Sequence, residues 1–139
     1  MKISKFDDLL LAATQQVNAQ RLLLVFTTAE LKEDATPEQR AAFESGHGGV
    51  LVPVMCVHKT LVEVGSFEQL KAQATHLQKP WSVLFATSLS GKGDELPAVK
   101  DAEHFLGVME ESVKKGRFEG LIAFNAEGIA VARVSRGAH

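Results

Sequence analysis

Residues 21–28, RLLLVFTT, decide the fold class, because an unbroken apolar run is closed here by two threonines. Such a run is typical of a strand that is covered on both faces rather than on one. Cover on both faces requires helices on both sides of a sheet, and helical patterns precede and follow this run in the sequence. We therefore predict an α/β (or α+β) domain with a strand at residues 21–28.

Other stretches resemble strands: residues 50–57 (VLVPVMCV), residues 81–87 (WSVLFAT) and a C-terminal β-hairpin of residues 121–124 and 129–134. Pro53 cannot donate a hydrogen bond to a neighbouring strand, so its strand is predicted to lie near an edge or to carry a bulge. Residues 58–65 allow either a second short strand or a plain connection. The sheet is thus expected to be mixed, with about five strands.

Four helices are predicted, at residues 4–18, 37–44, 66–79 and 97–115. Each has apolar residues at helical spacing or a clear start signal, such as Thr36, Pro37 and Gln39 before the second. The expected order is α-β-α-β-α-β-α-β-β, a single layered domain with helices against the sheet.

The composition bounds the classes of function. The chain has 139 residues, of which 45% are hydrophobic and 23% charged, and this predicts one globular domain over residues 1–139 with a frayed tail at 135–139. A net charge of −2 provides no positive field for nucleic acid or an anionic membrane. The single cysteine, Cys56, excludes an internal disulfide, and no signal peptide is recognised, so a cytoplasmic location is expected.

One candidate ligand site follows from the predicted strands. If residues 21–28, 50–57 and 81–87 run parallel, the loops after their carboxyl ends gather at one edge of the sheet. The candidate residues there are Thr28, His58, Lys59, Ser90, Gly91 and Lys92. Lysines and the backbone amides of a Gly-Lys-Gly turn suit a phosphate or carboxylate. The alternative is an ordinary solvent loop of the same composition.

A second candidate is a thiol centre. Cys56 and His58 are two residues apart and would share one face of a strand, where thiol and imidazole could form a nucleophilic pair. A buried cysteine acting as a small hydrophobic residue is the alternative. The histidines show no spacing typical of metal ligands, so neither a metal nor a cofactor is predicted.

The chain also resembles a family of small bacterial proteins of unknown function, many of them labelled "ribonucleotide reductase subunit alpha". The matching strings are FDDLL at 6–10, RLL at 21–23, DATPEQR at 34–40, Gly48-Gly49, MCV at 55–57, KPW at 79–81, Ser90-Gly91 and Phe124 to Gly128. The resemblance brings no established catalytic residue. A reductase large subunit needs several cysteines and several hundred residues, so this chain cannot perform that reaction alone.

The function predicted from these observations is a non-catalytic interaction module that binds a partner protein or itself. The sequence has the pattern of helices and strands of a folded domain, but no set of catalytic residue types that is expected to come together at one place. An unpaired strand at the hairpin or at Pro53 could mediate a homodimer. The alternatives are the anion-binding protein and the thiol enzyme described above.

Overall fold

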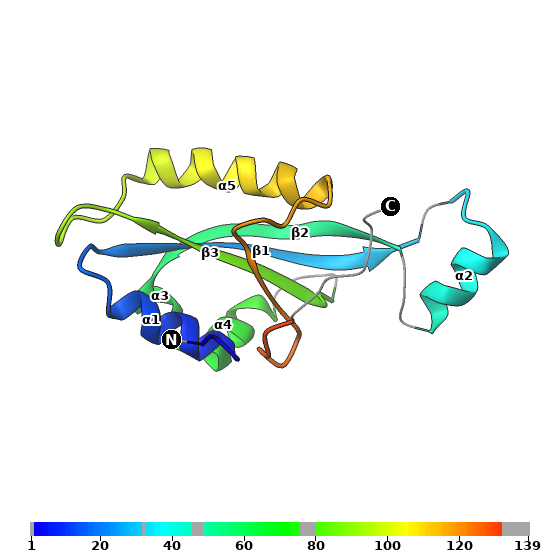
Figure 1. Ribbon diagram of the computed structural model, residues 1–139, viewed down its shortest axis with the longest axis horizontal. Coiled ribbons are helices and arrows are strands. Elements are labelled where there is room, and N and C mark those ends of the chain that lie inside the picture. Colours follow the sequence, from blue (N-terminus) through cyan, green and yellow to red (C-terminus); the bar gives the residue numbers. More distant parts are fainter. Residues whose placement is uncertain (1, 32, 46–48, 76–79, 132–139) are drawn as a thin grey trace.

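The computed structural model describes residues 2–31, 33–45, 49–75 and 80–131 (Figure 1). Its elements follow the order α-β-α-β-α-α-β-α-β. They are α1 (Phe6–Thr14), β1 (Gln20–Glu30), α2 (Pro37–Glu44), β2 (Val50–Thr60), α3 (Leu61–Val64), α4 (Phe67–Ala74), β3 (Val83–Ser90), α5 (Val99–Lys114) and β4 (Ile122–Phe124). The mixed helix and strand composition predicted from the sequence is confirmed.

The sheet has four strands within the described residues, in the order β2-β1-β3-β4, and every neighbouring pair is antiparallel. The expectation that the first three strands run parallel is therefore wrong. A parallel crossover after β1 must carry the chain back along about 36 Å of strand. The helix α2 is only about 12 Å long. It lies beyond the end of the sheet (Figure 1), so the chain returns directly beside β1 as a long hairpin.

Helices cover both faces of β1, as the sequence predicted. On one face, Leu23 and Val25 join Phe85 beneath α5. On the other face, Leu22, Leu24 and Phe26 lie against α1, α3 and α4. Figure 1 shows α5 on one side of the sheet and the three shorter helices on the other. The alternation of side chains along one strand thus divides the core into two layers.

The strand β2 is an edge strand, and its pairing with β1 is irregular near Pro53. Phe26 pairs with Met55 whereas Thr27 pairs with Pro53, which leaves Val54 as the extra residue of a bulge. Both readings of the proline, an edge and a bulge, are confirmed. Because Pro53 has no N–H, the ladder is irregular where that proline sits.

The opposite edge of the sheet is covered. Beyond β4, the Val131 N–H donates to the Ala123 carbonyl, and the Ala130 N–H donates to the Ser4 carbonyl. The Phe6 N–H in turn donates to the Gly128 carbonyl. The chain after β4 and the segment before α1 therefore continue the hydrogen bonding past β4.

Several boundaries differ from those expected. The first helix begins at Phe6 because Asp8 accepts hydrogen bonds from the N–H groups of Ser4 and Lys5, which keeps both outside the helix. Residues 61–64 form the short helix α3, capped by Thr60, rather than a strand. Of the helix predicted at 66–79, the structure describes α4, residues Phe67–Ala74. Residues 76–79 lie outside the described part.

The third and last strands also differ. β3 begins at Val83, two residues after Trp81, because the indole turns into the core against Phe26 and Phe67. The predicted hairpin is present as β4 and a bridge between Phe124 and Ala130. Of the second arm, predicted at 129–134, the described residues form this bridge and no fifth strand, and residues 132–139 lie outside the described part.

Candidate functional site

Polar side chains gather at the end of the sheet where β1 begins and β2 and β3 finish. Gln20 pairs with Ser90 across the strands, and its side-chain amide donates to the Ser90 hydroxyl at 2.8 Å. The Ser88 hydroxyl donates to the Oε1 atom of Gln20. These groups satisfy a glutamine that is almost fully buried.

Arg21 lies on the other face of the same strand end. Its residue is only 9% exposed, and its Nε and Nη2 atoms donate to the Pro97 carbonyl at 3.3 and 3.2 Å. The Nη1 atom lies 3.5 Å from Nδ1 of His58. A guanidinium can only donate, so Nδ1 of His58 is the acceptor and the ring hydrogen is on Nε2. Arg21 thus connects β1 to the start of α5 and fixes the tautomer of His58.

The structure separates the six predicted ligand-binding residues. His58, Lys59, Ser90, Gly91 and Lys92 lie at the polar end of the sheet, whereas Thr28 pairs with Val52 near the opposite end. Thr28 lies seven residues further along β1 than Arg21, a distance of about 23 Å. Thr28 therefore cannot share a small ligand with the other five. The expected grouping failed because antiparallel neighbours finish at opposite ends of the sheet.

The remaining five residues do not share one face of the sheet or one loop. His58 is opposite Leu23 and faces α5, whereas Lys59 is opposite Leu22 and faces the other layer. Lys92 belongs to a tight turn, in which its N–H donates to the Glu95 carbonyl. A pocket of about 330 Å³ beside this turn is lined by Ser90, Gly91 and Lys92, but also by the acidic residues Glu95 and Asp101. Negative charges near a pocket disfavour an anion, and the anion site stays a prediction.

A second pocket, of about 390 Å³, lies between β2 and α5. Cys56, Val57 and His58 line it from the strand. Glu103, Leu106, Gly107 and Glu110 line it from the helix. Cys56 is opposite Val25 and His58 is opposite Leu23, so both face α5. The prediction that the two residues share one face is confirmed.

The thiol of Cys56 is not activated as a nucleophile in this arrangement. Burial, and then the charge and hydrogen bonding of Glu110, raise its pKa from an ordinary 9.0 to about 11. A reactive cysteine has a lowered pKa, because the thiolate is the attacking form. The His58 ring instead faces Arg21. The surroundings of Cys56 therefore resemble those of a half-buried structural cysteine.

Alkylation of Cys56 should be slow in the folded protein. At pH 8 the thiolate fraction is expected to be about 100-fold lower with a pKa of about 11 than with a pKa of 9.0, so iodoacetamide should react about 100-fold more slowly than with the unfolded chain. Since the folded pKa is raised, the associated stability is present below pH 9 and lost as the pH rises through 11. Mass spectrometry of the labelled chain measures the rate. Equal rates for folded and unfolded chains at pH 8 would contradict the raised pKa.

The remaining feature of this region is the free side of β2. Ten of its eleven residues are only half-buried, although the strand is mostly apolar. Its described neighbours are β1 along one side, with α5 and α3 on the two faces. No described strand pairs with its other side. Within the part of the chain that the structure describes, the backbone groups on that side therefore have no strand partner.

Four residues of this region were not among the candidates predicted from the sequence: Arg21, Gln20, Gly107 and Glu110. Arg21 was included in an apolar run and Gln20 lay outside the predicted elements, and no local pattern shows that they meet Pro97 and β3. Glu110 lies in a charged stretch of the last predicted helix, and no local pattern shows that it meets Cys56. Gly107 could have been found from the sequence. A glycine inside a helix lowers its stability, so its presence there indicates a packing or functional role.

Within the described residues, no group of three or more histidine, cysteine, aspartate or glutamate side chains is arranged to hold a metal ion. None of the helices in the described part of the chain is both long and apolar enough to cross a membrane. Comparison of the chain with protein-family models, with curated proteins and with solved structures gives no match. The resemblance to the small bacterial family stays a prediction.

Proposed function

We propose that this protein is a non-catalytic module that associates with a second copy of itself through the edge strand β2. The observation that carries the proposal is the contrast between the two edges of the sheet. The edge at β4 is continued by the chain after β4 and by the segment before α1. The edge at β2 is eleven residues long, and no described strand pairs with its outer side.

The second half of β2 has only one of the usual protections of an edge strand, the charge of Lys59 near its end. Natural edges are protected by charges, proline, bulges or short length. Pro53 and the bulge at Val54 protect the first half. From Met55 to Thr60 the pairing with β1 is regular, and Met55, Cys56 and Val57 carry no charge. This half of the edge is therefore suited to pair with another strand.

We propose that the strand that pairs with the free side of β2 is the β2 strand of a second copy of the chain. Two identical edge strands can pair antiparallel about a two-fold axis, and such an interface closes without forming fibres. The paired strands extend the sheet across both copies, and the half-buried apolar residues of β2 gain a neighbour on each face. Burial of that surface favours association.

The test is the mass of the protein in solution, by sedimentation equilibrium over a range of concentrations. We expect about 30 kDa, twice the 15.0 kDa of one chain. Val57→Lys should return the mass to that of one chain, because two lysines would then meet at the paired edge. Val17→Lys is the matched control, since Val17 is 93% exposed and far from β2 in the sequence.

Circular dichroism and thermal unfolding must show that Val57→Lys is folded. If it is not, the wild-type mass alone decides. A wild-type mass of 15.0 kDa at all concentrations in which the chain is soluble would overturn the proposal. A dimer that Val57→Lys leaves intact in a folded chain would place the interface elsewhere and would also overturn it.

A further inference from the structure

We infer a specific register for this association: the two β2 strands pair antiparallel about an axis through Val57, and His58 of each copy donates a hydrogen bond to Glu110 of the other. The inference rests on the proposed function and deepens it. It assigns the centre of the interface, one polar contact that occurs twice, and a role for Gly107.

The alternation of side chains restricts where the axis can lie. Cys56 and His58 face α5, whereas Met55, Val57 and Lys59 face the other layer. Residues directly opposite each other in an antiparallel pair lie on the same face. A two-fold axis must therefore pass through a residue of β2, never between two residues.

The bulge and His58 together select the residue. A pairing that extends over all of β2 would place Pro53 and the bulge inside the ladder, where a donor is missing and the strand is bent. The regular stretch after the bulge is residues 55–60, so an axis at Val57 or at His58 lets five residues of each copy pair. An axis at His58 would put two His58 rings, each beside a buried Arg21, opposite each other, so the axis lies at Val57.

This register brings His58 of one copy opposite Cys56 of the other. Cys56 and Glu110 line the same pocket between β2 and α5, and the Glu110 carboxylate accepts a hydrogen bond from the Cys56 thiol. Arg21 occupies Nδ1 of His58, so the hydrogen on Nε2 is left to donate. The His58 imidazole of one copy therefore meets the Glu110 carboxylate of the other on the face covered by α5. The two-fold axis makes this contact occur twice.

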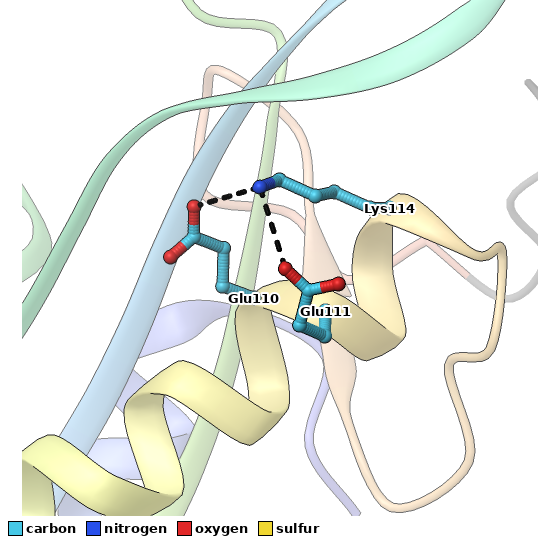
Figure 2. Close-up of polar contacts among 3 residues, drawn as sticks. All are labelled: Glu110, Glu111 and Lys114. Carbon is cyan, nitrogen blue, oxygen red and sulfur yellow. Dashed lines mark ion pairs between the residues drawn. The ribbon is translucent and has the colours of Figure 1, made fainter.

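Glu110 has the capacity to accept this additional hydrogen bond. Its carboxylate already accepts from Lys114 at 3.3 Å, and Lys114 also reaches Glu111 at 3.5 Å (Figure 2). A carboxylate offers about four acceptor positions, so Lys114 and Cys56 leave room for the imidazole. Glu110 lines the pocket beside β2, whereas Glu111 lines a different pocket on the outer side of α5.

Gly107 fits the same arrangement. It is exposed, lines the same pocket as Val57 and His58, and a Cβ added to it would meet no atom within 4 Å. Within the described chain, therefore, no contact explains a glycine that costs about 1 kcal/mol in a helix. An axis perpendicular to the sheet puts both α5 helices on one face, side by side. Gly107 lies beside the axis and lets them approach.

Disulfide cross-linking tests the register. Single cysteines are compared at positions 55, 56, 57 and 58, with Cys56→Ser in every variant except the wild type. Only residues on the axis meet their own copy at about 4.5–5.5 Å between Cα atoms, a separation that a disulfide can span. We expect Val57→Cys to give a cross-linked dimer on mild oxidation, and the wild-type Cys56 to give none.

The outcomes separate the register from the proposed function. A dimer that cross-links through position 55, 56 or 58 but not through 57 would overturn the register and leave self-association standing. A chain that sediments as a monomer would overturn both. A cross-link at position 57 alone would support both.

A matched pair of variants tests the polar contact. Glu110→Gln should raise the dimer dissociation constant about 10- to 100-fold, because two hydrogen bonds to a charged group are weakened. Glu111→Gln, which removes the same charge one residue away, should change it less than about threefold. Equal effects of the two variants, or no effect of Glu110→Gln, would overturn the contact.

Discussion

Replacing Phe6 by alanine should lower the free energy of unfolding by about 3–5 kcal/mol. The Phe6 side chain is completely buried, with its ring centroid 5.2 Å from that of Phe124 and 5.8 Å from that of Phe67. These rings belong to three segments that are far apart in the sequence. Removing one ring therefore leaves a cavity at the point where α1, α4 and β4 meet.

Denaturant unfolding measures this effect, with Phe105→Ala as the control. Phe105 is 46% exposed on α5, so its truncation should cost less than about 1 kcal/mol. A domain of this size has a total stability of about 5–15 kcal/mol, so the Phe6 variant should lose a large fraction of it. Equal losses for the two variants would show that Phe6 is not a core residue.

Gly128→Ala is the second variant for which we expect a large loss, of about 2–5 kcal/mol in the free energy of unfolding. Gly128 has φ of +80°, and a Cβ there would lie 2.8 Å from the Phe67 ring. The left-handed backbone costs an alanine about 1–2 kcal/mol, and overpacking adds about 1–3 kcal/mol. The Gly128 carbonyl also accepts the hydrogen bond from Phe6, so a shift of this turn disturbs the start of α1.

The matched control is Gly120→Ala. Gly120 also has φ of +80°, but a Cβ there would meet no atom within 4 Å. It should show only the cost of the backbone conformation, about 1–2 kcal/mol. The difference between the two variants measures the contact with Phe67, and a difference of zero would contradict the close approach seen at Gly128.

Local signals predicted the helices and strands well. The apolar run at residues 21–28 gave the most buried strand, because a run without alternation requires cover on two faces. Thr36, Pro37 and Gln39 predicted the start of α2, since capping depends only on neighbouring residues. Pro53 predicted the edge and the bulge, because a missing N–H has the same consequence in any fold.

The candidate site was predicted less well, and the reason is the direction of the strands. Thr28 was grouped with His58 on the assumption of parallel strands, and the antiparallel hairpin puts them at different ends. Cys56 and His58 were correctly placed on one face, because that follows from alternation within one strand. The approach of Glu110 to Cys56 depends on how α5 crosses the sheet, which no local pattern contains.

The sequence by itself determined most of the helices and strands, the strand that is covered on two faces, and the place where Pro53 interrupts pairing. These properties depend on residues within a few positions of each other. The tertiary structure alone decided that residues 61–64 are a helix, that β1 lies between β2 and β3, that the strands are antiparallel, and that α5 lies beside β2. Strand order and direction depend on contacts between residues far apart in the chain, so the features that support association through β2 appear only when the chain is folded.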